Sequence, residues 1–114
     1  MFKIKSVPDV EVDVPIQVPG DDGQEASLKV RYRLLSVSEA KAVFEAPDDE
    51  KLGDDELMER DIVDIQGAAD ADGKPLAFDK ELLRRLMDLS YVRPALVKGW
   101  LDVQSNRAQH VEKN

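Results

Sequence analysis

Two stretches of the sequence alternate apolar and polar residues without interruption, residues 10–18 and residues 26–34. Because successive residues of a β-strand point to opposite faces, each stretch would present one continuous apolar face. Residues 19–23 lie between them and read Pro-Gly-Asp-Asp-Gly, residue types that accept the backbone angles of turns. The pattern therefore predicts a β-hairpin over about residues 10–34.

Charged positions on the other face of the hairpin predict how its strands pair. One register places Asp13 opposite Arg31. It also places Glu11 opposite Arg33, so that both pairs combine opposite charges while the apolar faces coincide. Such cross-strand pairs contribute only about 0.2–1 kcal/mol each, but the two signals agree. Pro15 and Pro19 have no amide donor, which is typical of an edge strand, so we expect the first strand at an edge.

Helix signals follow the hairpin. Ser36 and Glu39 have the spacing of a capping box, which predicts a helix that begins there. This helix is short, because Pro47 cannot donate the next helical hydrogen bond. A second helix is expected from about Asp54, weakening at Gly67. Its apolar stripe would consist of Leu57, Met58, Ile62 and Ile65.

The segment from Asp70 to Pro75 reads Asp-Ala-Asp-Gly-Lys-Pro, which begins like a calcium-binding loop. Lys74 and Pro75 stand where that motif needs oxygen ligands and a glycine, and no closing glutamate fits. We therefore interpret the segment as a turn, in which the aspartates accept local backbone hydrogen bonds and Gly73 has a positive φ.

Two further helices complete the predicted elements. Asp79 is a suitable N-cap for a helix over about residues 80–89, with Leu82, Leu83, Leu86 and Met87 on its apolar face. The last helix begins around residues 90–94, because proline is tolerated in a first turn. Its apolar stripe consists of Val92, Leu96, Trp100 and Val103.

Trp100 is the only tryptophan of the sequence. We interpret it as a core anchor packed against the hairpin. The alternative is a position at the centre of a subunit interface, where tryptophan is enriched. Gly99 beside it lowers helix propensity by about 1 kcal/mol relative to alanine, which indicates close packing or a slight bend at this point.

These elements predict an α+β fold, an N-terminal antiparallel β-hairpin followed by about four short α-helices. The 114 residues suit one domain, since domains are commonly about 100–200 residues long. Within residues 1–114 we expect the hairpin at about residues 10–34, the helical part at about 36–106 and a polar tail at 107–114.

The formal net charge of −8 is concentrated in one segment. Residues 48–72 contain eleven acids and two bases. This balance argues against DNA or RNA as a ligand, because nucleic-acid binding proteins gather lysine and arginine to neutralise phosphates. We interpret the segment as a solvated helix with flanking loops; the alternative is a docking surface for a basic partner.

The sequence offers little for catalysis or metal binding. It has no cysteine and a single histidine, His110, so thiolate sites and disulfides are excluded. The acid pairs Asp54/Asp55 and Asp70/Asp72 are the alternative for an enzyme, but acid–base chemistry needs carboxyls in different environments and nothing predicts burial here. No apolar run approaches the about 20 residues that cross a bilayer, and residues 1–10 lack a signal-peptide core. We expect a cytoplasmic protein without catalytic activity, cofactor or membrane partner.

A set of motifs in a fixed order carries a family resemblance. They are a valine-rich hairpin with Val18-Pro19-Gly20 at its turn, a basic second strand with Lys29, Arg31 and Arg33 leading into Leu34-Leu35-Ser36, the Asp70-Ala71-Asp72-Gly73-Lys74-Pro75-Leu76 turn followed by Phe78, the helix start Tyr91-Val92-Arg93-Pro94-Ala95-Leu96 and the ending Lys113-Asn114. In this order the chain resembles, over nearly its whole length, the tail assembly chaperones of long-tailed (siphophage-like) bacteriophages or prophages.

The resemblance implies an assembly factor in the cytoplasm of the bacterial host that is absent from the mature virion. Its partners would be the tape measure protein, which it coats and solubilises, further copies of itself, the tail tube protein and a frameshifted longer form. An apolar groove between hairpin and helices would suit helical stripes of the tape measure protein. The alternative is a small structural or adaptor protein of a phage virion or cytoplasmic complex. The candidate self-association or partner interface consists of Val14, Pro15, Ile16, Tyr91, Arg93 and Trp100.

Overall fold

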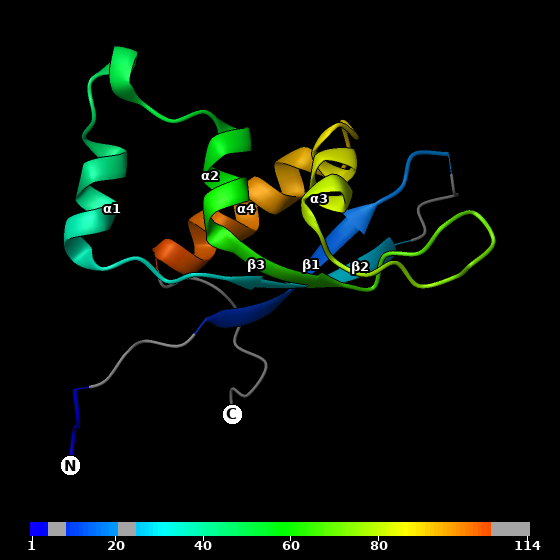
Figure 1. The fold of residues 1–114 in the computed structure, drawn as a ribbon, viewed down its shortest axis with the longest axis horizontal. Helices are drawn as coiled ribbons and strands as arrows, with labels where there is room; N and C mark the ends of the chain where they lie inside the picture. Colours follow the sequence, from blue (N-terminus) through cyan, green and yellow to red (C-terminus); the bar gives the residue numbers. More distant parts are fainter. Residues whose placement is uncertain (5–8, 21–24, 106–114) are drawn as a thin grey trace.

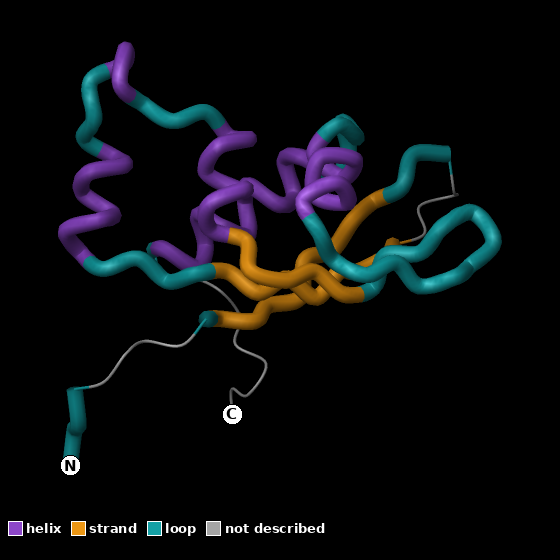
Figure 2. The backbone as a smooth tube through the Cα atoms, in the orientation of Figure 1, coloured by secondary structure: helices purple, strands orange, loops and turns teal. Residues whose placement is uncertain are grey.

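The computed structural model describes residues 1–4, 9–20 and 25–105, which form a three-stranded antiparallel sheet with helices over one face (Figures 1 and 2). The strands are β1 (Val10–Gln17), β2 (Glu25–Tyr32) and β3 (Ile62–Gln66), in the order β1-β2-β3. The helices are α1 (Val37–Phe44), the 3-10 helix η1 (Asp48–Glu50), α2 (Asp54–Asp61), α3 (Lys80–Met87) and α4 (Arg93–Gln104). The predicted α+β fold, a hairpin followed by four α-helices, is confirmed.

The hairpin forms as predicted, but its register differs by two residues. Asp13 lies opposite Lys29, whereas the predicted register placed it opposite Arg31. A slip of two residues keeps every side chain on the same face, so alternation alone cannot distinguish the two registers. In the observed register Arg33 lies beyond the strand pair, and its guanidinium pairs with Asp61 of α2 instead of an acid of β1.

A third strand replaces the second half of the predicted second helix. The helix α2 ends at Asp61, and the chain continues directly as β3, which pairs with β2. Ile62 and Ile65 are both buried, although residues three apart in a regular strand face opposite sides. The register shifts between Arg31 and Tyr32 of β2, and this irregularity turns both isoleucines toward the core.

The hydrophobic core lies between the inner face of the sheet and the helices α2, α3 and α4. The apolar faces predicted for the last two helices are confirmed. The side chains buried there are Val12, Val14, Ile16, Leu28, Val30, Tyr32, Leu57, Met58, Ile62, Ile65, Leu82, Leu83, Leu86, Met87, Val92, Leu96, Trp100 and Val103. The helix α1 contributes no buried residue and stands to one side of α2 (Figure 1).

Local hydrogen bonds fix the helix starts as predicted. The Ser36 hydroxyl accepts from the amide of Glu39 at 3.1 Å, and the Glu39 carboxylate accepts from the amide of Ser36 at 2.9 Å, which completes the capping box of α1. Asp79 caps α3 by accepting from the amide of Leu82 at 2.8 Å. Pro94 lies in the first turn of α4.

The segment between β3 and α3 is the predicted turn. One oxygen of Asp70 accepts from the amides of Asp72 and Lys74 at 2.9 and 3.0 Å. Gly73 has a φ of 83°, a conformation that glycine adopts without strain. The turn is closed by its own backbone, with Ala69 bridged to Pro75.

The helix α4 approaches the sheet closely at Gly99. The Tyr32 hydroxyl donates to the carbonyl of Leu96 at 2.7 Å, and a Cβ atom at position 99 would collide with that hydroxyl. The close packing predicted for Gly99 is therefore confirmed. None of the helices within the described ranges is long and apolar enough to cross a membrane. The predicted polar tail, residues 107–114, with His110, lies outside the described residues.

Candidate functional site

Asp61 is a fully buried carboxylate at the C-terminal end of α2. The Trp100 indole N–H donates to its Oδ2 at 2.7 Å. Arg60 donates to both carboxylate oxygens, at 2.8 and 3.0 Å, and Arg33 donates to Oδ1 at 3.0 Å. The carboxylate thus connects α2, α4 and the end of β2 at one point.

The environment of Asp61 keeps it charged. Burial raises the pKa of this carboxyl, but the hydrogen bonds from Arg60, Trp100 and Arg33 and the positive charge of Arg60 outweigh burial, so its pKa lies below the usual range. Both oxygens are engaged by donors of the protein itself and neither is exposed. This arrangement suits a structural role, because a substrate would have no access to the carboxylate.

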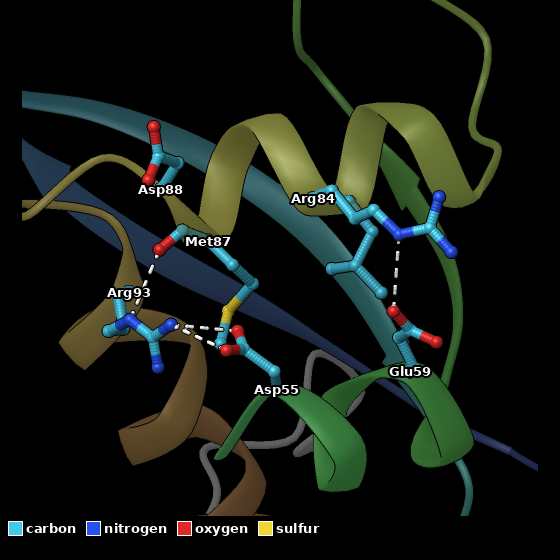
Figure 3. A pocket seen from close by; sticks show the side chains of 7 residues that line it. Asp55, Glu59, Arg84, Met87, Asp88 and Arg93 are labelled. Atoms are coloured by element: carbon cyan, nitrogen blue, oxygen red, sulfur yellow. Dashed lines mark hydrogen bonds and ion pairs between the residues drawn. The ribbon is translucent and has the colours of Figure 1, made fainter. Parts of the chain in front are cut away.

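A cleft of about 300 Å³ lies between α2, α3 and the start of α4 (Figure 3). Four of its charged side chains are paired across the helices, while Asp88 forms no ion pair with any residue that the structure describes. Arg93 donates to both oxygens of Asp55 at 2.7 and 2.9 Å, and its Nε donates to the carbonyl of Met87 at 3.1 Å. The hydrogen bond to Asp55 raises the pKa of Arg93. Arg84 and Glu59 form a second, longer pair at 3.4 Å.

These ion pairs give a structural role to some acids of the acidic segment, residues 48–72. Acids of α2 that the sequence suggested were solvated are held by arginines of α3 and α4, which connects the three helices (Figure 3). The pairs are exposed to water, so each contributes little stability. Among the residues that the structure describes, no three or more His, Cys, Asp or Glu side chains are grouped so that they could hold a metal ion.

A second hollow lies beside α1. We call it the α1 pocket; it has a volume of about 250 Å³ and is lined by Glu39, Ala42, Val43, Ala46, Glu50, Leu52 and Arg60. Most of this lining is apolar, with acids at its edge. Val37 of α1 is 76% exposed, and Phe44 is about half exposed, its ring lying 5.7 Å from that of Trp100. Positions 37 and 44 are seven residues apart and share one face of α1, opposite the face whose residues line the α1 pocket.

The predicted interface residues do not form one surface. Val14, Ile16 and Trp100 are buried in the core, so they are not accessible to a partner in this fold. The burial of Trp100 agrees with the core interpretation. Pro15 is exposed on β1, while Tyr91 and Arg93 are partly exposed near the cleft. Their role in a partner contact stays a prediction.

The predicted groove between hairpin and helices is filled by the core of the chain itself. One hollow with an apolar wall is the α1 pocket, whose residues Val43 and Leu52 we did not single out as site residues from the sequence. A larger one, of about 450 Å³, lies between β3 and the segment before α3 and is lined mainly by residues 65–69 and 75–78. The signal that could have found Val43 and Leu52 is a short helix rich in alanine and valine that precedes a proline and an acidic run. Such a pattern is equally typical of a buried helix, so it does not predict exposure.

The edge position of β1 is confirmed. The sheet order places β2 in the centre, and no strand among the described residues pairs with the outer side of β1. The outer face of the hairpin carries exposed ion pairs, Glu11 with Arg31 and Asp13 with Lys29. An open edge of this kind presents unpaired backbone groups that can accept a further strand.

The sequence and the fold were compared with those of known proteins. No protein-family model and no curated protein matches the sequence, and no solved structure matches the fold.

Proposed function

We propose that this protein is a tail assembly chaperone of a long-tailed bacteriophage or prophage, which coats the tape measure protein and keeps it in solution while the tail is built. The ordered motifs of the sequence support this function, from the turn at 18–20 to the helix start at 91–96. The observation that carries the proposal is the apolar surface of α1, a helix without a buried residue beside the α1 pocket.

The α1 pocket offers a way to hold an apolar helix. A partner helix can bind by placing apolar side chains one turn apart into a hollow of matching character. Ala42, Val43 and Ala46 of the α1 segment supply the apolar wall of this hollow together with Leu52. Exposed apolar area of this kind is a feature of protein interaction sites. The net charge of −8 favours solubility of the resulting complex.

Self-association would let many copies line a long partner. The open edge of β1 is the site we propose for contacts between copies, and Pro15 lies within it. The tail tube protein and a frameshifted longer form are further proposed partners. The longer form would arise when the ribosome slips back one nucleotide at the codons of Glu112-Lys113-Asn114, which can form a run of adenines. These residues lie outside the described part of the chain. The proposed location is the cytoplasm of the bacterial host.

Coexpression with the tape measure protein tests the function. The parent chain should raise the soluble fraction of the tape measure protein and copurify with it. Leu52→Lys should abolish both effects, whereas Val63→Lys on β3 should retain them, because the two side chains are similarly exposed, 42% and 43%. Circular dichroism checks that both variants fold. An equally soluble tape measure protein without the chain would contradict the proposal.

Purified particles separate this function from its alternative. A chaperone leaves before the tail is complete, so mass spectrometry of finished virions should not detect the chain. Stoichiometric amounts in the virion would identify a small structural or adaptor protein instead.

A further inference from the structure

The segment Met1–Ile4 carries large apolar side chains that the fold leaves uncovered. Phe2 is 87% exposed and Ile4 is 92% exposed. The two residues are separated by one position, so in an extended segment they point to the same side. The segment therefore presents a small apolar face, and its exposure in water is unfavourable by about 25 cal/mol per Å² of apolar surface.

The α1 pocket has the size and lining to receive this face. Its wall is formed mainly by Ala42, Val43, Ala46 and Leu52. An engineered apolar cavity of about 150 Å³ binds benzene, so a hollow of about 250 Å³ has room for the ring of Phe2. Ile4 would then lie against the apolar side chains at the edge of the hollow.

Charge favours the same contact. The first eight residues of the sequence contain two lysines and no acid. Two acids, Glu39 and Glu50, and one base, Arg60, line the α1 pocket, and the adjoining η1 adds Asp48 and Asp49, so acids outnumber bases there. Opposite charges on two surfaces speed their encounter and favour one orientation.

We propose that the segment Met1–Ile4 of one copy docks in the α1 pocket of a second copy, with Phe2 as its anchor. Figure 1 shows why the contact joins two copies: residues 1–4 lie below the sheet, while α1 lies above it. The donor surface and the acceptor surface are different, so the contact is heterologous and each copy can both give and receive a segment. The contact needs no tape measure protein, but it uses the pocket that the proposed function assigns to that partner, so the segment has to leave before a tape measure helix can bind there.

Cysteine crosslinking tests this contact directly, because the sequence contains no cysteine. One preparation carries Ile4→Cys and a second, distinguished by an affinity tag, carries Leu52→Cys. When they are mixed under mild oxidation, a disulfide-linked heterodimer should form at least ten times faster than with Val63→Cys as the second preparation. Val63 is the matched control, since its exposure equals that of Leu52.

Two further measurements make the outcome decisive. Adding Phe2→Ser to the Ile4→Cys chain should slow crosslinking to Leu52→Cys by at least five-fold, because it removes the anchor. A single chain carrying both Ile4→Cys and Leu52→Cys should give linked dimers whose yield falls when the protein is diluted before oxidation. Equal rates with Leu52→Cys and Val63→Cys, or a link within one chain that persists on dilution, would overturn the proposal. None of these readouts involves the tape measure protein.

Discussion

The indole N–H of Trp100 and the carboxylate of Asp61 meet at 2.7 Å inside the protein, 39 residues apart in the sequence. The contact fastens α4 to the junction where α2 becomes β3. Arg33 and Arg60 complete the shell of donors from the partly exposed side. A charged group in the interior is retained here because every oxygen has a donor.

Asp61→Ala should lower the free energy of unfolding by about 3 kcal/mol, since removal of one partner from a buried ion pair leaves the others unsatisfied. The lower part of the usual range applies because Arg33 and Arg60 keep contact with water. Urea denaturation measures the change. Asp55→Ala, which removes an exposed partner of Arg93, is the control and should unfold near the parent midpoint. Equal midpoints for the two variants would contradict this prediction.

The lowered pKa of Asp61 gives a pH-dependent prediction. A carboxyl whose pKa is lower in the folded state stabilises the fold above its unfolded pKa, about 3.9 for aspartate, and this stabilisation is lost as pH falls through the folded pKa. The difference in unfolding free energy between the parent and Asp61→Asn should therefore be full at pH 7 and shrink in acid. Denaturant titrations at a series of pH values measure it. A difference independent of pH would show that the carboxylate charge contributes nothing.

Trp100→Ala should destabilise the fold by about 3–5 kcal/mol, because it removes a large side chain that the core encloses. Thermal melting should show a large decrease. Leu101→Ala is the control on the exposed side of the same helix and should melt close to the parent. An unchanged melting temperature together with loss of self-association would place Trp100 in an interface.

Gly99→Ala should destabilise the fold by about 1–3 kcal/mol, the usual cost of overpacking, although alanine favours helices by about 1 kcal/mol. The reason is the collision of the new Cβ with the Tyr32 hydroxyl. The same substitution in a Tyr32→Phe background should cost less, since the hydroxyl is gone. A double-mutant cycle by chemical denaturation measures this coupling. Additive effects would exclude the collision as the cause.

The open edge of β1 should support self-association, with assemblies larger than a monomer at high micromolar concentration. Pro15 implies that alternate backbone amides of β1, including that of Asp13, face the free side. Asp13→Pro should therefore reduce association without disturbing the pairing of β1 and β2. Asp13→Ala is the control and loses only an exposed ion pair with Lys29. Light scattering that finds only monomer for the parent would refute this mode of assembly.

Local signals predicted the parts of the fold that depend on neighbouring residues. The capping box at Ser36, the N-cap at Asp79 and the turn at Gly73 all form within a few residues, so their sequence signatures suffice. The apolar faces of α3 and α4 follow from helical spacing for the same reason. The edge position of β1 followed from two residues without an amide donor, Pro15 and Pro19.

The features that the sequence did not predict depend on distant partners. Residues 62–66 contain isoleucines three apart, which fits a helix as well as a bulged strand, and only pairing with β2 decides between them. Asp61 lies in an acidic run that looks solvated, and its burial follows from Trp100 and Arg33 far away in the sequence. The α1 pocket depends on how α1 lies relative to α2.

The absence of buried residues in α1 has a consequence for cooperativity. Elements with few core contacts unfold locally at a lower free energy than the whole molecule. Residues 36–53 should therefore unfold before the sheet and α4. The ring of Phe44 lies against the sole tryptophan, which makes Trp100 an intrinsic optical reporter of that opening. On heating, tryptophan emission should therefore change before far-ultraviolet circular dichroism does. Amide exchange in α1 should likewise be faster than in α4.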